Sequence, residues 1–115
     1  MTVEWHEMSA LSLGRGIGAG EIDASELCDY FLERIKRIDT KHDIYLRTTP
    51  ERARAEAAAA AERARQNLRL SPLDGVPISW KDLYDTDGDI TGHGAKVLQE
   101  RVATGDATVV ERATK

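Results

Sequence analysis

The chain has 115 residues and a mass of 12.7 kDa, which is enough for one domain and not for two. Its 16 Lys and Arg against 20 Asp and Glu give a formal net charge of −4, which argues against a dedicated nucleic-acid binder with a basic stripe. Much of the 41% hydrophobic content is alanine, so little bulky apolar material is left for a core. We therefore expect the chain to be part of a longer protein.

Several features that the sequence lacks indicate in which cellular compartment the protein works. The single Cys28 cannot form an internal disulfide, and no CxxC pair offers a zinc or redox site. Residues 1–10 include Glu4 and Glu7 and no apolar run, so they do not resemble a signal peptide. No segment approaches the roughly 18 apolar residues of a membrane span. These features predict a soluble, cytoplasmic protein with no membrane contact.

A short first helix is predicted over residues 9–17. Ser9 can accept a backbone hydrogen bond at its start, and Leu11, Leu13 and Ile17 form a weak apolar stripe. The segment also holds a GxGxxA pattern at Gly14, Gly16 and Ala19. A dinucleotide fingerprint needs a preceding strand, and residues 9–13 contain no β-branched residue, so we interpret the glycines as a helix end and a turn.

Two longer helices follow, over residues 24–39 and 50–68. Asp23 and Glu26 have the spacing of a capping box, and apolar residues then recur at helical intervals. Pro50 is typical of a first helical turn, and the alanine-rich run after it is a strong helix former. Because the stripe of the second helix is alanine, its packing partner should approach closely.

After residue 71 the pattern changes to turns and short extended pieces. Alternation in the segment Val76-Pro77-Ile78-Ser79-Trp80 predicts a strand over residues 76–80, followed by a loop over 82–94. Asp106 can cap a last, partial helix over 107–115. No Gly or Pro ends that helix, so we expect the sequence to stop within it.

Several residues suggest metal or cofactor sites, and each has a simpler interpretation. Asp82, Asp85, Asp87 and Asp89 suggest a calcium loop, but Ile90 and Lys96 occupy positions where the EF-hand pattern needs Gly and Glu. The three histidines, His6, His42 and His93, show no paired metal spacing. Of these, His93 lies between two glycines and is a candidate for lining a pocket. We predict no metal and no organic cofactor, and we place Cys28 in the core.

A family resemblance gives Lys81 a specific role. Residues 72–86, PLDGVPISWKDLYDT, closely resemble the lysine motif of the amidase signature family. The resemblance covers residues from about Ser9 to Lys115 and is most specific from Gly75 to Asp82. It continues at Gly88, Thr91, Gly94, Lys96 to Leu98 and Asp106 to Val110, and upstream at Ala24 to Leu27 and Leu32 to Ile35.

The resemblance implies an α/β fold with a mixed central β-sheet surrounded by helices, of which residues 1–115 would be the N-terminal portion. It implies amide hydrolysis by a Ser–cis-Ser–Lys triad, with Lys81 as the triad lysine. A lysine is almost wholly protonated at pH 7, so it acts as a base only where burial or neighbouring donors favour its neutral form. The family's two serines come from a Ser- and Gly-rich segment that is not in this sequence.

The sequence departs from the family pattern in the same region. Ala95 stands where the family often has serine, and Gly92-His93 is an unusual pair, so the substrate pocket cannot be carried over from the family. None of Ser9, Ser12, Ser25, Ser71 and Ser79 lies in the serine motif. We expect this chain alone to have no amidase activity.

Partners and alternatives follow from the same resemblance. The expected partners are a small-molecule amide and the remainder of the amidase domain. We expect no direct contact with nucleic acid. The sequence does not decide whether the protein forms homo-oligomers. One alternative is the A subunit of a glutamine-dependent tRNA amidotransferase, which would release ammonia for a partner enzyme. The other is a catalytically inert helical interaction module in which Lys81 is merely exposed.

Overall fold

The structure is a computed structural model that describes residues 4–115. The chain forms two compact units, one up to Pro77 and the other from Ile78 to Lys115. Helices dominate, as predicted, and residues 4–115 contain no β-strand. One isolated antiparallel bridge, between Ile90 and Val102, is the only β-type pairing in this range.

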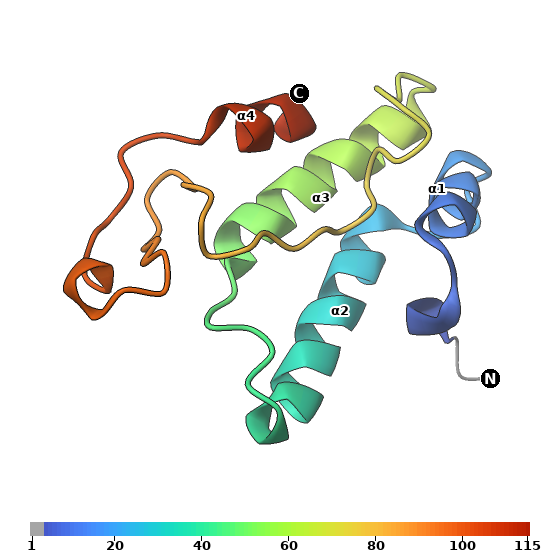
Figure 1. Cartoon of the computed structure of the whole chain (residues 1–115). Coiled ribbons are helices and arrows are strands. Elements are labelled where there is room, and N and C mark those ends of the chain that lie inside the picture. Colours follow the sequence, from blue (N-terminus) through green and yellow to red (C-terminus); the bar gives the residue numbers. More distant parts are fainter. Residues whose placement is uncertain (1–3) are drawn as a thin grey trace. The chain divides into compact units, whose positions relative to one another are not determined.

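The first unit contains three α-helices, α1 (Ala10–Gly18), α2 (Ala24–Ile38) and α3 (Pro50–Arg65) (Figure 1). The N-caps predicted for α1 and α2 are confirmed. The Ser9 side chain accepts a hydrogen bond from the Ser12 N–H, and the Asp23 carboxylate accepts from the N–H groups of Ser25 and Glu26. Each side chain satisfies donors that have no partner inside the helix.

Helix α3 ends three residues earlier than predicted. Asn67 adopts a left-handed conformation with φ of 57°, and its N–H donates to the Ala64 carbonyl. The Leu68 N–H donates to the Arg63 carbonyl. This is the Schellman arrangement, which terminates the helix at Arg65 although Gln66 and Leu68 are good helix formers.

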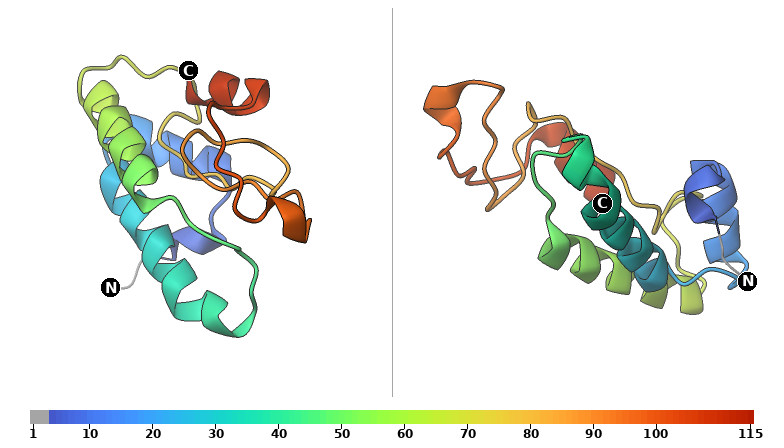
Figure 2. Two further views of the ribbon diagram at one scale, coloured as in Figure 1. Left: turned by 90° about the vertical axis from the view of Figure 1, so that its left-hand side faces the viewer. Right: turned by 90° about the horizontal axis from the view of Figure 1, so that it is seen from below.

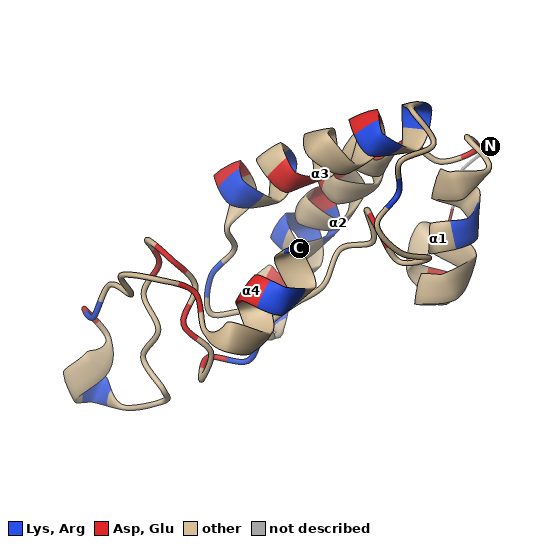
Figure 3. Cartoon of the chain, turned by 90° about the horizontal axis from the view of Figure 1, so that it is seen from above, with Lys and Arg blue, Asp and Glu red and all other residues tan. Residues whose placement is uncertain are grey.

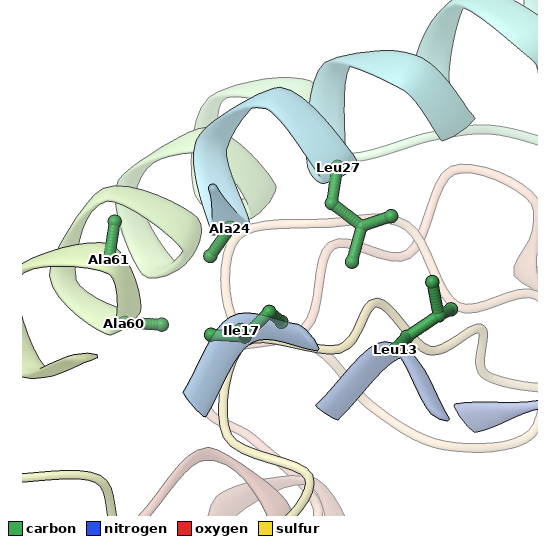
Figure 4. Packing of buried hydrophobic residues seen from close by; sticks show 6 residues of the cluster. All are labelled: Leu13, Ile17, Ala24, Leu27, Ala60 and Ala61. Atoms are coloured by element: carbon green, nitrogen blue, oxygen red, sulfur yellow. The ribbon is translucent and has the colours of Figure 1, made fainter. Parts of the chain in front are cut away.

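The core of the first unit lies where the three helices meet. Helices α2 and α3 run in opposite directions along each other, joined by residues 39–49 (Figures 1 and 2). Six buried residues form the cluster drawn in Figure 4: Leu13, Ile17, Ala24, Leu27, Ala60 and Ala61. The buried face of α3 is alanine, as predicted, so this helix packs closely without bulky side chains. Cys28 is also buried on α2, and burial raises the pKa of its thiol, with the nearby Asp29 adding to the effect.

The predicted strand over residues 76–80 is wrong. These residues belong to no helix or strand, and Ile78 is 64% exposed. A strand exists only when a neighbouring strand accepts and donates its backbone hydrogen bonds. Within the described residues no segment pairs with this one, so the alternation in its sequence has no ladder to stabilise it.

The second unit is mostly loop, with a 3-10 helix at Lys96–Leu98 and helix α4 (Thr108–Thr114). Asp106 does not cap α4 as predicted; its carboxylate accepts a hydrogen bond from the Asp87 N–H at 2.8 Å. The cap position is Ala107, whose N–H donates to the Asp85 carbonyl. Among the described helices, none combines the length and the apolarity needed to cross a lipid bilayer.

Candidate active site

The first half of the lysine motif is built into the core of the first unit. Val76 packs against the buried cluster, and Gly75 has φ of 97°, a conformation that side chains rarely adopt. A Cβ on Gly75 would lie 3.1 Å from both the Ala24 and the Ile17 side chains and 3.5 Å from Ala60. Glycine is therefore required here, because the chain passes through the junction of all three helices.

Asp74 fixes the turn that precedes this glycine. Its side chain is only 7% exposed and accepts two hydrogen bonds from Arg63 of α3, at 2.7 and 2.8 Å. The same carboxylate accepts from the Leu70 N–H at 3.0 Å. The hydrogen bonds from Arg63, more than the one from Leu70, hold the pKa of Asp74 below its ordinary value, against the opposing effect of burial.

We predict that Asp74→Asn lowers the free energy of unfolding by about 2 kcal/mol near neutral pH, because Arg63 loses its charged partner. The folded state binds fewer protons at Asp74 than the unfolded state, so wild-type stability falls as the pH drops through the lowered pKa of this carboxyl. Denaturant unfolding of both proteins between pH 7 and pH 3 should show the difference shrinking at acid pH. A constant difference would contradict the assignment.

Lys81 lies in the second unit, at the start of a tight turn. Its carbonyl oxygen accepts hydrogen bonds from the N–H groups of Leu83, at 2.7 Å, and Tyr84, at 3.2 Å. Trp80 precedes the turn and Tyr84 ends it. Their rings pack edge to face, with centroids 5.7 Å apart. Lys81 is exposed in this chain.

The turn is linked to residues 91 and 92. The Asp82 carboxylate accepts a hydrogen bond from the Gly92 N–H at 3.1 Å, and the Thr91 hydroxyl donates to the Tyr84 carbonyl at 3.5 Å. Thr91 is the one buried polar residue among the described positions, with 2% exposure. The sequence did not reveal these contacts, because they join residues about ten positions apart through a loop without regular structure.

A second link joins Asp85 to Arg101. The guanidinium donates to both carboxylate oxygens, at 2.7 and 2.9 Å, and hydrogen bonding from Arg101 lowers the pKa of Asp85. The Nε2 atom of His93 lies 3.9 Å from the same carboxylate. His93 itself has φ of 53°, an unusual conformation for a residue other than glycine. Asp82 and Asp85 thus both form hydrogen bonds within the second unit.

The glycine-rich segment of the first unit does not form a nucleotide loop. Gly14 and Gly16 are buried inside α1, and the residues before the helix form no strand. The interpretation as a helix end and a turn holds for Ala19, the C-cap of α1, but not for Gly14 and Gly16, which lie within the helix. Gly14 allows the helix to approach the backbone of Pro72 and Leu73.

The sequence analysis did not identify one group of side chains of the types that ligate metals. Glu4, His6 and Glu7 lie on and beside the 3-10 helix Trp5–Glu7, with their ligand atoms within 4.8 Å of one another. The ExHE spacing could have revealed it. The Nδ1 atom of His6 is hydrogen-bonded to the Tyr30 hydroxyl and lies 3.3 Å from Glu4. Exposed carboxylates and a histidine engaged by a tyrosine do not by themselves define a metal site.

Comparison with known proteins identifies the family. The model of the Amidase family matches residues 26–115, which include the whole lysine motif. This chain belongs to the Amidase family. Lys81 and the turn around it lie within the matched residues.

Relatives of this amidase chain are much longer. It is 40% identical over 107 residues to the A subunit of the glutamyl-tRNA(Gln) amidotransferase of Thioalkalivibrio sulfidiphilus, covering 93% of this chain and 22% of the relative. It is 43% identical over 99 residues to the protein of the same name from Anaeromyxobacter sp. strain K, covering 86% of this chain and 20% of that protein. The chain thus spans about a fifth of the length of these relatives.

A solved structure resembles the chain closely. It was described as an unexpected vestigial protein complex that reveals the evolutionary origins of an s-triazine catabolic enzyme. The TM-score is 0.88 at 33% identity, over 93% of this chain and 24% of the other. An inhibitor-bound form of that complex gives 0.87.

Proposed function

We propose that this chain is the N-terminal, lysine-bearing portion of a single amidase-signature domain that hydrolyses a carboxylic amide to an acid and ammonia or an amine. Lys81 is the base of a Ser–cis-Ser–Lys triad, and both serines come from sequence outside this chain. The family match over residues 26–115, which carries the lysine motif, supports this proposal most directly.

In this proposal the catalytic groups are shared between this chain and the rest of the protein. The nucleophilic serine attacks the amide carbonyl, and its proton passes through the second serine to the Nζ atom of Lys81. Covalent catalysis then divides amide cleavage into acylation and hydrolysis of the acyl-enzyme. This chain contributes the base and the loops around it, and it contributes neither the nucleophile nor donors for the oxyanion.

A second candidate function is that of the A-type component of a glutamine-dependent tRNA amidotransferase. The names of the two relatives, at 40% and 43% identity, favour it. The bond broken would be the side-chain amide of glutamine, so Lys81 keeps the same role. The two functions differ in substrate and in the need for partner proteins.

The experiment that separates them is a substrate panel offered to the complete purified protein, with ammonia release as the readout. We predict turnover of simple carboxylic amides without partner proteins for a free-standing amidase. Selective turnover of glutamine that depends on partner proteins and charged tRNA would instead identify an amidotransferase component. Absence of any amide turnover in both settings would contradict both candidates. The charge of α3, the longest described helix, does not distinguish the two candidates, because Arg and Glu residues are interleaved along it (Figure 3).

A further inference from the structure

Asp82, the residue directly after Lys81, has no role in the proposed reaction but forms a hydrogen bond with Gly92. Asp82 is half-buried, and its Oδ1 atom accepts the hydrogen bond from the Gly92 N–H. A Cβ placed on Gly92 would lie 3.3 Å from the Oδ2 atom of Asp82. The Asp82 carboxylate therefore lies close against the Gly92 backbone, and a side chain at position 92 would push it slightly aside.

The backbone before Lys81 has no regular secondary structure. Residues 78–80 belong to no helix or strand, so no ladder of hydrogen bonds fixes the direction from which the chain enters the turn. The turn itself is short and closed on the Lys81 carbonyl. Whatever holds Asp82 in place consequently also sets the position of the adjacent Lys81 Cα.

The partner of Asp82 is itself well anchored. The Thr91 N–H donates to the Arg101 carbonyl at 3.2 Å, and the Ala103 N–H donates to the Asp89 carbonyl at 2.9 Å. The bridge between Ile90 and Val102 lies between these two bonds. Gly92 is therefore the end of a small paired segment, which can hold the carboxylate in a fixed place.

We propose that Asp82 is a positioning residue for Lys81: its carboxylate clamps the lysine turn onto Gly92 and so fixes the origin of the lysine side chain. The inference rests on the proposed function of Lys81 as the triad base. Lysine has a flexible four-carbon stem, so a fixed Cα is the first requirement for bringing Nζ to a serine. A misplacement of about 1 Å at a reacting group can cost roughly 100-fold in rate.

The test compares Asp82→Asn and Asp82→Glu in the complete protein. Asn keeps the length of the side chain and an oxygen that accepts from Gly92, but loses the charge. Glu keeps the charge and adds a methylene that pushes the turn away from Gly92. Positioning predicts that Glu lowers kcat by roughly 100-fold and Asn by roughly 10-fold, with KM little changed in both.

Two control variants, Asp87→Asn and Lys81→Ala, complete the experiment. Asp87→Asn, at an exposed carboxylate in the same loop, should leave kcat unchanged. A higher kcat for Glu than for Asn would overturn the inference, because it would make the charge of Asp82 more important than its reach. Wild-type kcat in both variants beside an inactive Lys81→Ala would also overturn it. A fully active Lys81→Ala would instead refute the proposed function of Lys81.

Discussion

Lys81→Ala in the complete protein should reduce amide hydrolysis by at least about 10³-fold while leaving the fold intact. A positioned base contributes roughly 10²–10⁴-fold, and members of a catalytic triad lose nearly the whole benefit together when one is removed. Lys81 lies outside the buried cluster of the first unit, so its removal should leave that core packed and the protein folded. Ammonia release and calorimetry on the same preparations provide the two measurements.

Lys81→Arg separates the base from the charge. Arginine keeps a long cationic side chain but stays protonated, so it cannot accept the proton of the serine. We expect it to be as inactive as the alanine variant. Lys96→Ala, at an exposed lysine in the 3-10 helix of the same unit, should retain wild-type activity. Activity in Lys81→Arg near the wild-type level would show that this residue supplies charge and not a base.

The helices could be predicted from the sequence because their signals are local. Ser9 and Asp23 act on N–H groups two or three residues away, so cap and helix lie within one short stretch of sequence. The alanine face of α3 could be predicted for the same reason, since helical spacing alone places Ala57, Ala60 and Ala61 on one side.

Features that depend on distant segments could not be predicted. The segment over 76–80 alternates like a strand, but a strand needs a partner that the described chain does not contain. Asp106 has the residue type of a helix cap, yet the Asp87 N–H is its partner instead. The end of α3 was missed for a different, local reason: the left-handed conformation of Asn67 overrides the helix propensity of its neighbours.

In the candidate site, too, local features could be predicted and contacts between distant residues could not. Lys81 could be singled out because the motif around it is a contiguous run of residues that resembles a family. Its supports could not, because the contacts of Asp82 with Gly92 and of Asp85 with Arg101 join residues 10 and 16 positions apart. Nothing in the spacing of these residues distinguishes them from a solvated acidic loop.

Gly14→Ala should lower the free energy of unfolding of the complete protein by about 3 kcal/mol, at the upper end for overpacking. A Cβ at this buried position in α1 would overlap the carbonyl oxygen of Pro72 and lie 3.2 Å from its carbonyl carbon. Both are backbone atoms of the turn that Asp74 holds, so neither can move aside as a side chain would. Either α1 shifts away from the buried cluster or the turn gives up its hydrogen bonds.

Two other glycines calibrate this effect in the same denaturant experiment. Gly105→Ala adds a Cβ with no atom within 4 Å, so its free energy of unfolding should stay near that of the wild type. Gly18→Ala, in the same helix as Gly14, would bring Cβ within 2.6 Å of the Arg69 guanidinium, a side-chain group that can move without a backbone shift, at the expense of its hydrogen bonds to the Pro72 and Asp74 carbonyls. Because alanine also favours the helix by up to about 1 kcal/mol, its net loss should be smaller than that of Gly14→Ala. Equal losses at Gly14 and Gly18 would mean that helix packing on the Pro72 backbone is not what requires glycine in α1.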